Sequence, residues 1–269
     1  ILGGVTAAGK SDLALELAQE YSAAIVSADA MTVFRGMSIG TAKPKQSVLD
    51  RLPHACVDVV DPDEDFSVAD FVEAFQQVAR TSTNVLVVGG TPFYLSALVR
   101  PLADMPASDP EVRARLEAIE DPHTQLKSVD PESAARLHPN DTMRVVRALE
   151  VHAISGQTMT ELHSRGGRIE PVDATVVWMD RANLEERIES RLQQMVRAGY
   201  VGEVESLLAA GWSPDLKPLR SFSYRHIVGH VRGEMDEAEA IRCTARDTRR
   251  FARKQRTWAR GMGWQPVGQ

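Results

Sequence analysis

A glycine-rich loop near the start of the chain constrains the fold more than any other feature. The pattern G-x-x-x-x-G-K-S lies between the apolar Leu2 and the leucine-rich segment 13–18, and this context predicts a strand, a loop and a helix. In such a loop the backbone N–H groups surround phosphate, the lysine reaches a terminal phosphate and the serine ligates Mg²⁺. We therefore expect a ligand with at least two phosphates to be bound by Gly4, Val5, Thr6, Ala7, Ala8, Gly9, Lys10 and Ser11.

The strand that usually supplies an acid to such a loop lacks one here. Phosphoryl transfer needs a carboxylate at the end of a second buried strand, where it organises Mg²⁺ and water. The apolar run Val85–Val88 is typical of a central parallel strand, yet Gly89–Thr91 follows it. A carboxylate instead follows the run Ala24–Ser27, so Asp29 is expected at the ligand-binding edge of the sheet. Asp29 could act as a general base, as a partner of Mg²⁺ through one of the ion's ligands or as a cap of the next turn.

The order of apolar and helical segments predicts two domains. Strand and helix patterns alternate through about residue 100, with one helix expected over Val68–Arg80, and strand character resumes over Ala174–Met179. Between them, helix starts are predicted at Asp109–Pro110, Asp130–Pro131 and Asn140–Asp141. We expect an α/β fold like that of P-loop NTPases, a parallel sheet flanked by helices, over 1–103 and 171–269. A helical insertion domain is expected over 104–170.

Charge is distributed unevenly along the 269-residue chain, whose net charge is −6. Residues 1–75 contain twelve acidic side chains and five basic ones, whereas residues 241–260 contain eight basic side chains and one acid, Asp247. A basic run of this kind is either a solvated helix face that pairs with acidic segments or a surface for polyphosphate or RNA. Within it, Trp258 could stack on a base or anchor the core.

Two cysteines, Cys56 and Cys243, are the only ones in the sequence, which is typical of a reducing compartment. No stretch is long and apolar enough to span a membrane, and no signal peptide is recognisable. We therefore expect a cytoplasmic protein with no membrane partner. Because Ile1 already belongs to the first predicted strand, we also expect a few residues to precede it.

Several motifs occur together over nearly the whole chain. After the phosphate loop they are Asp29–Met37, Ile39–Pro44, Pro53–His54, Gly89–Tyr94, Ser108–Arg113, His138–Asp141, Arg144–Glu150, Ser223–Arg225 and Lys254–Trp258. As a set they closely resemble the bacterial tRNA dimethylallyltransferases. The phosphate loop is widely shared, but the I-G-T-A-K-P stretch, the H-P-N-D stretch and the basic C-terminal run are not shared with nucleoside kinases.

The resemblance implies transfer of a dimethylallyl group from dimethylallyl diphosphate to N6 of the adenosine next to the anticodon of tRNA, on its 3′ side. The phosphate loop would then bind a leaving group, which accounts for the missing strand-end acid. Asp29 would take or orient the N6 proton, while Thr91 would hydrogen-bond the amine or the diphosphate, or cap the helix that follows. Mg²⁺ on Ser11 would help to neutralise the diphosphate. The implied catalytic residues are Asp29, Thr91, Lys10 and Arg225.

The target adenosine must be flipped out of the anticodon loop to reach such a site. The resemblance implies that the insertion clasps the anticodon stem of tRNA, and we expect the enzyme to be a monomer. Arg147 could meet a phosphate or pair with Glu150. The implied tRNA contacts are Asp29, Ala30, Met31, Thr32, Arg113, Thr142, Met143, Arg144, Val145, Val146, Ser221, Phe222, Ser223, Tyr224, Arg225, His226, Arg253, Lys254, Gln255, Arg256, Thr257, Trp258 and Arg260.

The chain departs from the family pattern at three positions that bear on base recognition. Thr32 and Phe34 stand where the family usually has Gln and Tyr, and Ser223 stands where a glycine usually precedes the Tyr-Arg pair. Three alternatives stay open: a prenyltransferase that uses free adenine nucleotides, a phosphate-loop kinase for a small metabolite, and an RNA-binding protein without activity. The basic C-terminal run argues against the first two, and the intact loop argues against the third.

Overall fold

The computed structural model describes residues 1–100, 102–167 and 171–267. The chain is divided into two compact units. One is formed by residues 1–97 and 173–269 and the other by residues 98–172. The sequence places these divisions at 103/104 and 170/171. The second predicted division adjoins residues 168–170, which are outside the described residues.

The first unit contains a six-stranded parallel sheet in the order β3-β2-β4-β1-β5-β6. Its strands are β1 (Leu2–Gly4), β2 (Ala24–Ser27), β3 (His54–Ala55), β4 (Val85–Gly89), β5 (Val177–Met179) and β6 (Pro266–Val267). The predicted strands at β1, β2, β4 and β5 are thus confirmed, although β5 is three residues shorter than predicted. Because all strands are parallel, their carboxyl ends meet at one edge of the sheet.

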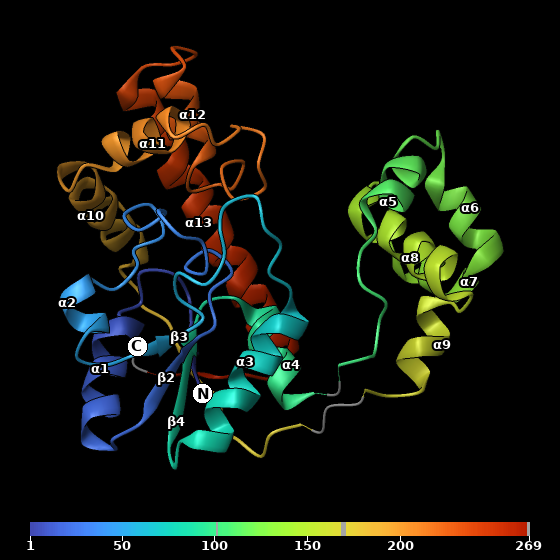
Figure 1. Ribbon diagram of the computed structural model, residues 1–269, viewed down its shortest axis with the longest axis horizontal. Coiled ribbons are helices and arrows are strands. Elements are labelled where there is room, and N and C mark those ends of the chain that lie inside the picture. Colours follow the sequence, from blue (N-terminus) through green and yellow to red (C-terminus); the bar gives the residue numbers. More distant parts are fainter. Residues whose placement is uncertain (101, 168–170, 268–269) are drawn as a thin grey trace. The chain divides into compact units, whose positions relative to one another are not determined.

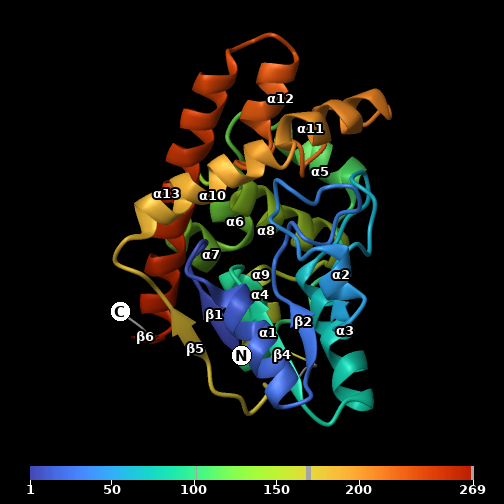
Figure 2. The same ribbon diagram turned by 90° about the vertical axis from the view of Figure 1, so that its left-hand side faces the viewer.

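Helices cover both faces of this sheet. The helices of this unit are α1 (Lys10–Glu20), α2 (Gln46–Leu49), α3 (Val68–Thr81), α4 (Pro92–Val99), α10 (Leu184–Arg197), α11 (Tyr200–Ala209), α12 (Arg225–Val231) and α13 (Glu237–Gly261). In both views α1 lies on one face of the sheet and α3 and α4 lie on the other (Figures 1 and 2). Figure 2 shows α10 and α11 above the carboxyl ends of β1 and β2.

Apolar side chains between these layers form the core of the first unit. Ile25 on β2, Phe71 on α3, Leu95 on α4 and Trp178 on β5 are each at most 2% exposed. Gly3 permits this packing, because a Cβ at that position would lie 2.7 Å from the Trp178 ring and 2.8 Å from Leu95. Helix α3 begins at Val68 as predicted and ends one residue beyond the predicted Arg80. The core thereby fixes the strand ends from which the site is built.

The second unit contains five helices among its described residues. They are α5 (Pro110–Glu117), α6 (Pro122–Val129), α7 (Pro131–Arg136), α8 (Thr142–Ser155) and α9 (Met159–Ser164). Asp109 and Asp130 cap α5 and α7 as predicted, by accepting bonds from backbone N–H groups. Asp141 precedes α8 but makes no side-chain cap bond, and its carboxylate instead pairs with Arg144. The predicted start of this helix is therefore confirmed, but the predicted cap is wrong because the Asp141 side chain accepts no bond from a backbone N–H of α8.

A buried carboxylate organises the start of α5. Glu150 on α8 is fully buried and accepts bonds from the Ser108 hydroxyl (2.8 Å), the Asp109 N–H (3.0 Å), Arg113 (2.7 Å) and Arg147 (2.6 Å). These donors lower the pKa of Glu150 to about 2, against the opposing effect of burial. Arg147 therefore pairs with Glu150, the structural alternative, and Arg113 joins it there.

Candidate active site

The phosphate loop has the expected conformation at the carboxyl end of β1. Gly9 adopts a left-handed conformation (φ 93°) immediately before α1, and a Cβ on Gly4 would lie 2.5 Å from the Met179 carbonyl oxygen. The Lys10 ammonium donates hydrogen bonds to the carbonyl oxygens of Gly4 (3.0 Å) and Val5 (2.8 Å). These bonds hold the lysine across the mouth of the loop, where a terminal phosphate would meet it.

Burial disfavours the charged form of Lys10. Its pKa is lowered to about 8, first by desolvation and then by the nearby positive charge of Arg191, while the carboxylate of Asp29 raises it. Asp29 is therefore close enough to the phosphate loop to interact with Lys10. The structure thus brings together two of the predicted catalytic residues.

Asp29 and Thr91 are held together by backbone contacts between the ends of β2 and β4. A Cβ on Gly89 would lie 2.0 Å from the Ala28 carbonyl oxygen, so only glycine fits there. That oxygen accepts a bond from the Thr91 N–H (3.0 Å), and the Thr91 hydroxyl accepts one from the Ala30 N–H (3.0 Å). This close approach explains in physical terms why β4 ends in glycine and not in a carboxylate.

The side chains of Asp29 and Thr91 serve different local roles. Asp29 Oδ1 accepts a bond from the Met31 N–H at 2.9 Å, which forms the turn predicted as one of its three possible roles. This bond leaves the carboxylate with further acceptor capacity. The Thr91 hydroxyl accepts a bond from the Ala30 N–H, so it joins the segments that follow β2 and β4.

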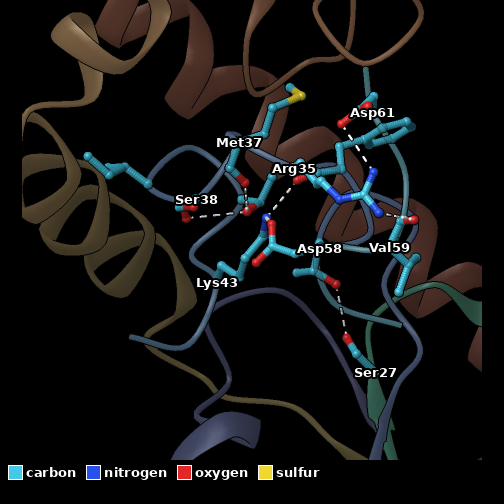
Figure 3. A network of polar contacts seen from close by, with 12 residues as sticks. Ser27, Arg35, Met37, Ser38, Lys43, Asp58, Val59 and Asp61 are labelled. Atoms are coloured by element: carbon cyan, nitrogen blue, oxygen red, sulfur yellow. Dashed lines mark hydrogen bonds and ion pairs between the residues drawn. The ribbon is translucent and has the colours of Figure 1, made fainter. Parts of the chain in front are cut away.

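The segment after Asp29 is fixed by a polar network (Figure 3). The Lys43 ammonium, whose side chain is 2% exposed, donates to the Phe34 carbonyl and to Asp58, both at 2.6 Å. Arg35 donates to the Val59 carbonyl oxygen and to Asp61. These contacts account for the lysine of the I-G-T-A-K-P stretch, which supports the segment that carries the predicted base-reading residues.

The rest of that stretch is held by a partly buried acid on α11, Glu203. Glu203 accepts bonds from the N–H groups of Ser38 (2.8 Å), Ile39 (2.6 Å) and Gly40 (3.0 Å), and from the Tyr224 hydroxyl (2.6 Å). A Cβ on Gly40 would lie 2.5 Å from the Tyr224 ring. Tyr224 is fully buried in this arrangement. The Tyr224 side chain thus positions this loop, and the contact of Tyr224 with tRNA stays a prediction.

A pocket of about 540 Å³ lies between the phosphate loop and α10. Its walls include Lys10 and Ser11 from the loop side and Arg187 and Arg191 from α10. The Arg187 Nε donates to the Ala7 carbonyl oxygen at 2.7 Å. The sequence analysis did not identify these two arginines. Their spacing of four residues, which places both on one helix face, was the available signal.

Gln255 joins three parts of the site. Its side-chain oxygen accepts a bond from the Thr6 N–H at 2.9 Å, and its Nε2 donates to the Gly90 carbonyl oxygen at 2.6 Å. The side chain is buried, with the residue 1% exposed. The Gln255 side chain thus connects α13 to the phosphate loop and to the turn after β4, and its contact with tRNA stays a prediction.

Two arginines expected to meet phosphates are paired with acids. Arg256 donates to both carboxylate oxygens of Asp180, at 2.7 and 2.8 Å. Arg225 contacts the buried Asp247, which also accepts bonds from His226 (2.8 Å) and from Arg246 and Arg250. Hydrogen bonds from His226, Arg225 and Arg246 hold the pKa of Asp247 far below its usual range, against the effect of burial. The structure thus places Arg225 in a cationic cluster on α12 and α13.

The other predicted tRNA contacts differ in exposure. Val145 and Val146 are buried within the second unit, and Thr32 is buried with its hydroxyl 3.0 Å from that of Ser27. The contacts of these three residues with tRNA stay predictions. Ala30, Met31, Arg113, Ser221, Phe222, Ser223 and His226 are partly buried. The exposed ones are Thr142, Met143, Arg144, Arg225, Arg253, Lys254, Thr257, Trp258 and Arg260.

Comparisons with known proteins identify the family. The family model described as IPP transferase matches residues 32–262, and the model described as Isopentenyl transferase matches residues 1–58. A tRNA dimethylallyltransferase 1 of Citrifermentans bemidjiense is 43% identical over 96% of this chain and 87% of its own length. A tRNA dimethylallyltransferase of Geobacter metallireducens is 41% identical over 97% of this chain and 88% of its own.

Solved structures agree with this assignment. The full-length tRNA isopentenylpyrophosphate transferase of Bacillus halodurans is 33% identical, with a TM-score of 0.64 over 96% of this chain and 85% of that one. A eukaryotic dimethylallyltransferase acting on tRNA shares the fold, with a TM-score of 0.81 at 23% identity over 96% of this chain and 68% of that one. The chain therefore belongs to the IPP transferase family, whose members named here are tRNA dimethylallyltransferases and tRNA isopentenylpyrophosphate transferases.

Proposed function

We propose that this enzyme transfers a dimethylallyl group from dimethylallyl diphosphate to the exocyclic N6 of the adenosine 3′-adjacent to the anticodon of tRNA. The N6 lone pair attacks C1 of the dimethylallyl group, the C1–O bond breaks, and diphosphate leaves with both phosphates intact. The N6 proton passes to a base. One observation carries the proposal. The strand next to the phosphate loop, β4, is followed by Gly90 and Thr91 and not by an acid that could orient water for attack on a phosphate. The nearby acid is Asp29, after the end of β2.

Asp29 is the base that this geometry favours. It follows β2 at the carboxyl edge of the sheet, and its charge interacts with that of Lys10, which spans the mouth of the phosphate loop. A carboxylate in this position lies near the phosphate-binding loop without belonging to it. Thr91, tied to Ala30 by its hydroxyl, fixes the turn that carries Asp29 and would hydrogen-bond the amine or the diphosphate.

The residues around the loop fit Mg²⁺ bound chiefly through the diphosphate. Ser11 is exposed in the first turn of α1, and it lines the pocket beside Lys10. Over the described part of the chain, no group of three His, Cys, Asp or Glu side chains could enclose a metal ion. Mg²⁺ often binds through one or two protein oxygens, substrate phosphates and water, which suits Ser11. When bound, the ion would supply positive charge to the diphosphate oxygens.

Exposed cations on α13 and on the second unit support tRNA as the acceptor. Arg253, Lys254 and Arg260 are exposed on α13, and Trp258 is 38% exposed on the same helix. In the second unit, Arg144 is exposed at the start of α8. Cations of this kind bind the phosphate backbone of RNA, and an exposed indole offers a surface for a flipped or unpaired base. We expect these residues to contact the anticodon stem-loop.

Other features of the proposal concern the whole protein. We infer a fold of the P-loop NTPase type, since a parallel sheet carries the phosphate loop directly after β1, and a helical insertion formed by the second unit. Within the structure's described ranges, no helix is long and apolar enough to cross a membrane. We expect a cytoplasmic monomer that acts on tRNA.

A prenyltransferase for free adenine nucleotides is the second candidate. The match of residues 1–58 to the Isopentenyl transferase model favours it, because that segment carries the phosphate loop and Asp29. The match of residues 32–262 to the IPP transferase model extends over the helical unit and α13, for which a free nucleotide has less use. We therefore rank tRNA above a free adenine nucleotide as the acceptor.

The choice of acceptor tests the proposal. The full chain is incubated with Mg²⁺ and radiolabelled dimethylallyl diphosphate, and with unmodified tRNA, a free adenine nucleotide or no acceptor in separate reactions. We expect label on tRNA alone. Label on the free nucleotide would support the second candidate, and absence of transfer combined with ATP turnover would contradict both.

A further inference from the structure

The segment 38–43 contributes to the wall of the pocket beside the phosphate loop. Ala42 lines this pocket together with Lys10 and Ser11. Its φ is 53°, a left-handed conformation that residues other than glycine rarely adopt. Such a conformation persists only where the surrounding structure imposes it. The shape of this wall therefore depends on the contacts that hold the segment.

Hydrogen bonds within the segment join its two ends. The Ala42 N–H donates to the Ile39 carbonyl oxygen, and the Lys43 N–H donates to the Ser38 carbonyl oxygen, both at 2.9 Å. The Thr41 hydroxyl donates to the carbonyl oxygen of residue 37 at 2.7 Å. Because these bonds connect residues 37–39 to residues 41–43, a shift at the start of the segment would also move Ala42.

The start of the segment is bound by the carboxylate of Glu203 on α11. Its Oε2 accepts bonds from the N–H groups of Ser38 and Ile39. Its Oε1 accepts bonds from the Gly40 N–H and from the Tyr224 hydroxyl. A carboxylate offers about four acceptor positions, so these donors use its whole acceptor capacity. Through this one side chain, α11 fixes the backbone that leads to Ala42.

We propose that Glu203 is a positioning residue for the prenyl donor, because it holds the segment 38–43 where Ala42 completes the pocket for the diphosphate. This inference rests on the proposed function. Among the described residues, the pocket wall includes Ala42 but not Glu203, so Glu203 acts through the segment. Without its bonds, Ala42 can leave the left-handed conformation, and fewer molecules have a pocket ready for the donor. The apparent affinity then falls in proportion to that fraction.

Titration with inorganic diphosphate tests the inference without requiring transfer. The full chain is titrated in the presence of Mg²⁺ by calorimetry, as wild type, Glu203→Gln and Glu205→Gln. Glu203→Gln keeps the size of the side chain but replaces one acceptor oxygen with an amide group that donates. Glu205 is a matched control, because it is an exposed glutamate on the same helix. We expect Glu203→Gln to weaken diphosphate binding about 5- to 30-fold, the size of one or two net hydrogen bonds. Glu205→Gln should bind like the wild type.

Steady-state kinetics separate a positioning role from a merely structural one. A variant that only folds less well contains fewer active molecules, which lowers kcat and leaves KM unchanged. For Glu203→Gln we expect the KM for dimethylallyl diphosphate to rise by the same factor as the Kd for diphosphate, with kcat largely retained. A lowered kcat with an unchanged KM would overturn the inference.

The titration also distinguishes failure of this inference from failure of the proposed function. Wild-type protein that binds diphosphate while Glu203→Gln binds it equally well would overturn the inference and leave the function intact. Wild-type protein that binds no diphosphate would overturn both. If Glu203→Gln does not fold, Glu203→Asp decides. It keeps the charge but withdraws the carboxylate by one methylene group, so we expect weakened binding, and unchanged binding would overturn the inference.

Discussion

Lys10 is a residue whose charge depends on the pH range in which the enzyme would be assayed. Desolvation lowers its pKa to about 8, so the ammonium is present below that pH and is lost as the pH rises through it. Because diphosphate binding needs the ammonium, we expect kcat/KM for dimethylallyl diphosphate to fall above about pH 8. Lys10→Arg, if active, should shift the decline to higher pH. A profile that stays level up to the ordinary lysine pKa of 10.5 would contradict this account.

Asp29 should affect the chemical step more than binding. Replacing it with Asn retains the shape and the acceptor for the Met31 N–H but removes the base. We expect the single-turnover rate of transfer to fall about 10²- to 10⁴-fold, the usual contribution of a general base, with diphosphate binding largely retained. Unchanged single-turnover kinetics in Asp29→Asn would remove this residue from the base role.

At the scale of elements, α13 is connected to the phosphate loop by Gln255. Gln255→Ala would leave the Thr6 N–H and the Gly90 carbonyl without their partner in a buried place. We expect a loss of about 1–3 kcal/mol in the free energy of unfolding and a higher KM for dimethylallyl diphosphate. Thr257→Ala, an exposed change two residues along the same helix, should leave the unfolding midpoint close to that of the wild type. Equal stability of the two variants, measured by denaturant unfolding, would contradict the stabilising role of the two Gln255 hydrogen bonds.

Sequence patterns predicted elements well where burial produces a periodic signal. The strands β1, β2, β4 and β5 and the helix α3 were predicted because apolar runs and capping residues mark them. Strands β3 and β6, with two residues each, are too short to produce such a pattern. They form only because a neighbouring strand offers a free edge, which is a property of the folded sheet.

The site was predictable where the backbone dictates it and less so where side chains converge from distant segments. The phosphate loop, Asp29 and Thr91 could be placed from local motifs. By contrast, Gln255 and Tyr224 lie in motifs whose sequence predicts RNA contacts, yet both side chains are buried in the fold. In the sequence, Arg187 and Arg191 look like ordinary charges on the polar side of an amphipathic helix, and only the packing of α10 against the loop places them on the wall of the pocket.

At the scale of the whole molecule, tRNA binding should depend on exposed cations. Arg253 is exposed on α13, whereas Arg256 is engaged with Asp180. We expect Arg253→Ala to weaken tRNA binding and to reduce the salt slope of log K by about 0.7–0.9, the value for one lost phosphate contact. Arg256→Ala should chiefly lower stability, since it leaves Asp180 without its ion-pair partner. An unchanged salt slope in Arg253→Ala, measured by filter binding, would contradict a phosphate contact at that residue.

The central claim is that the phosphate loop holds a leaving group while the adenosine beside the anticodon takes the prenyl group. The most direct test digests tRNA that has reacted with dimethylallyl diphosphate, locates the modification by mass spectrometry and measures released diphosphate in the same reaction. The account predicts one diphosphate for each dimethylallyl group, found on N6 of the adenosine 3′-adjacent to the anticodon. A modification elsewhere in the tRNA, or release of monophosphate in place of diphosphate, would contradict it.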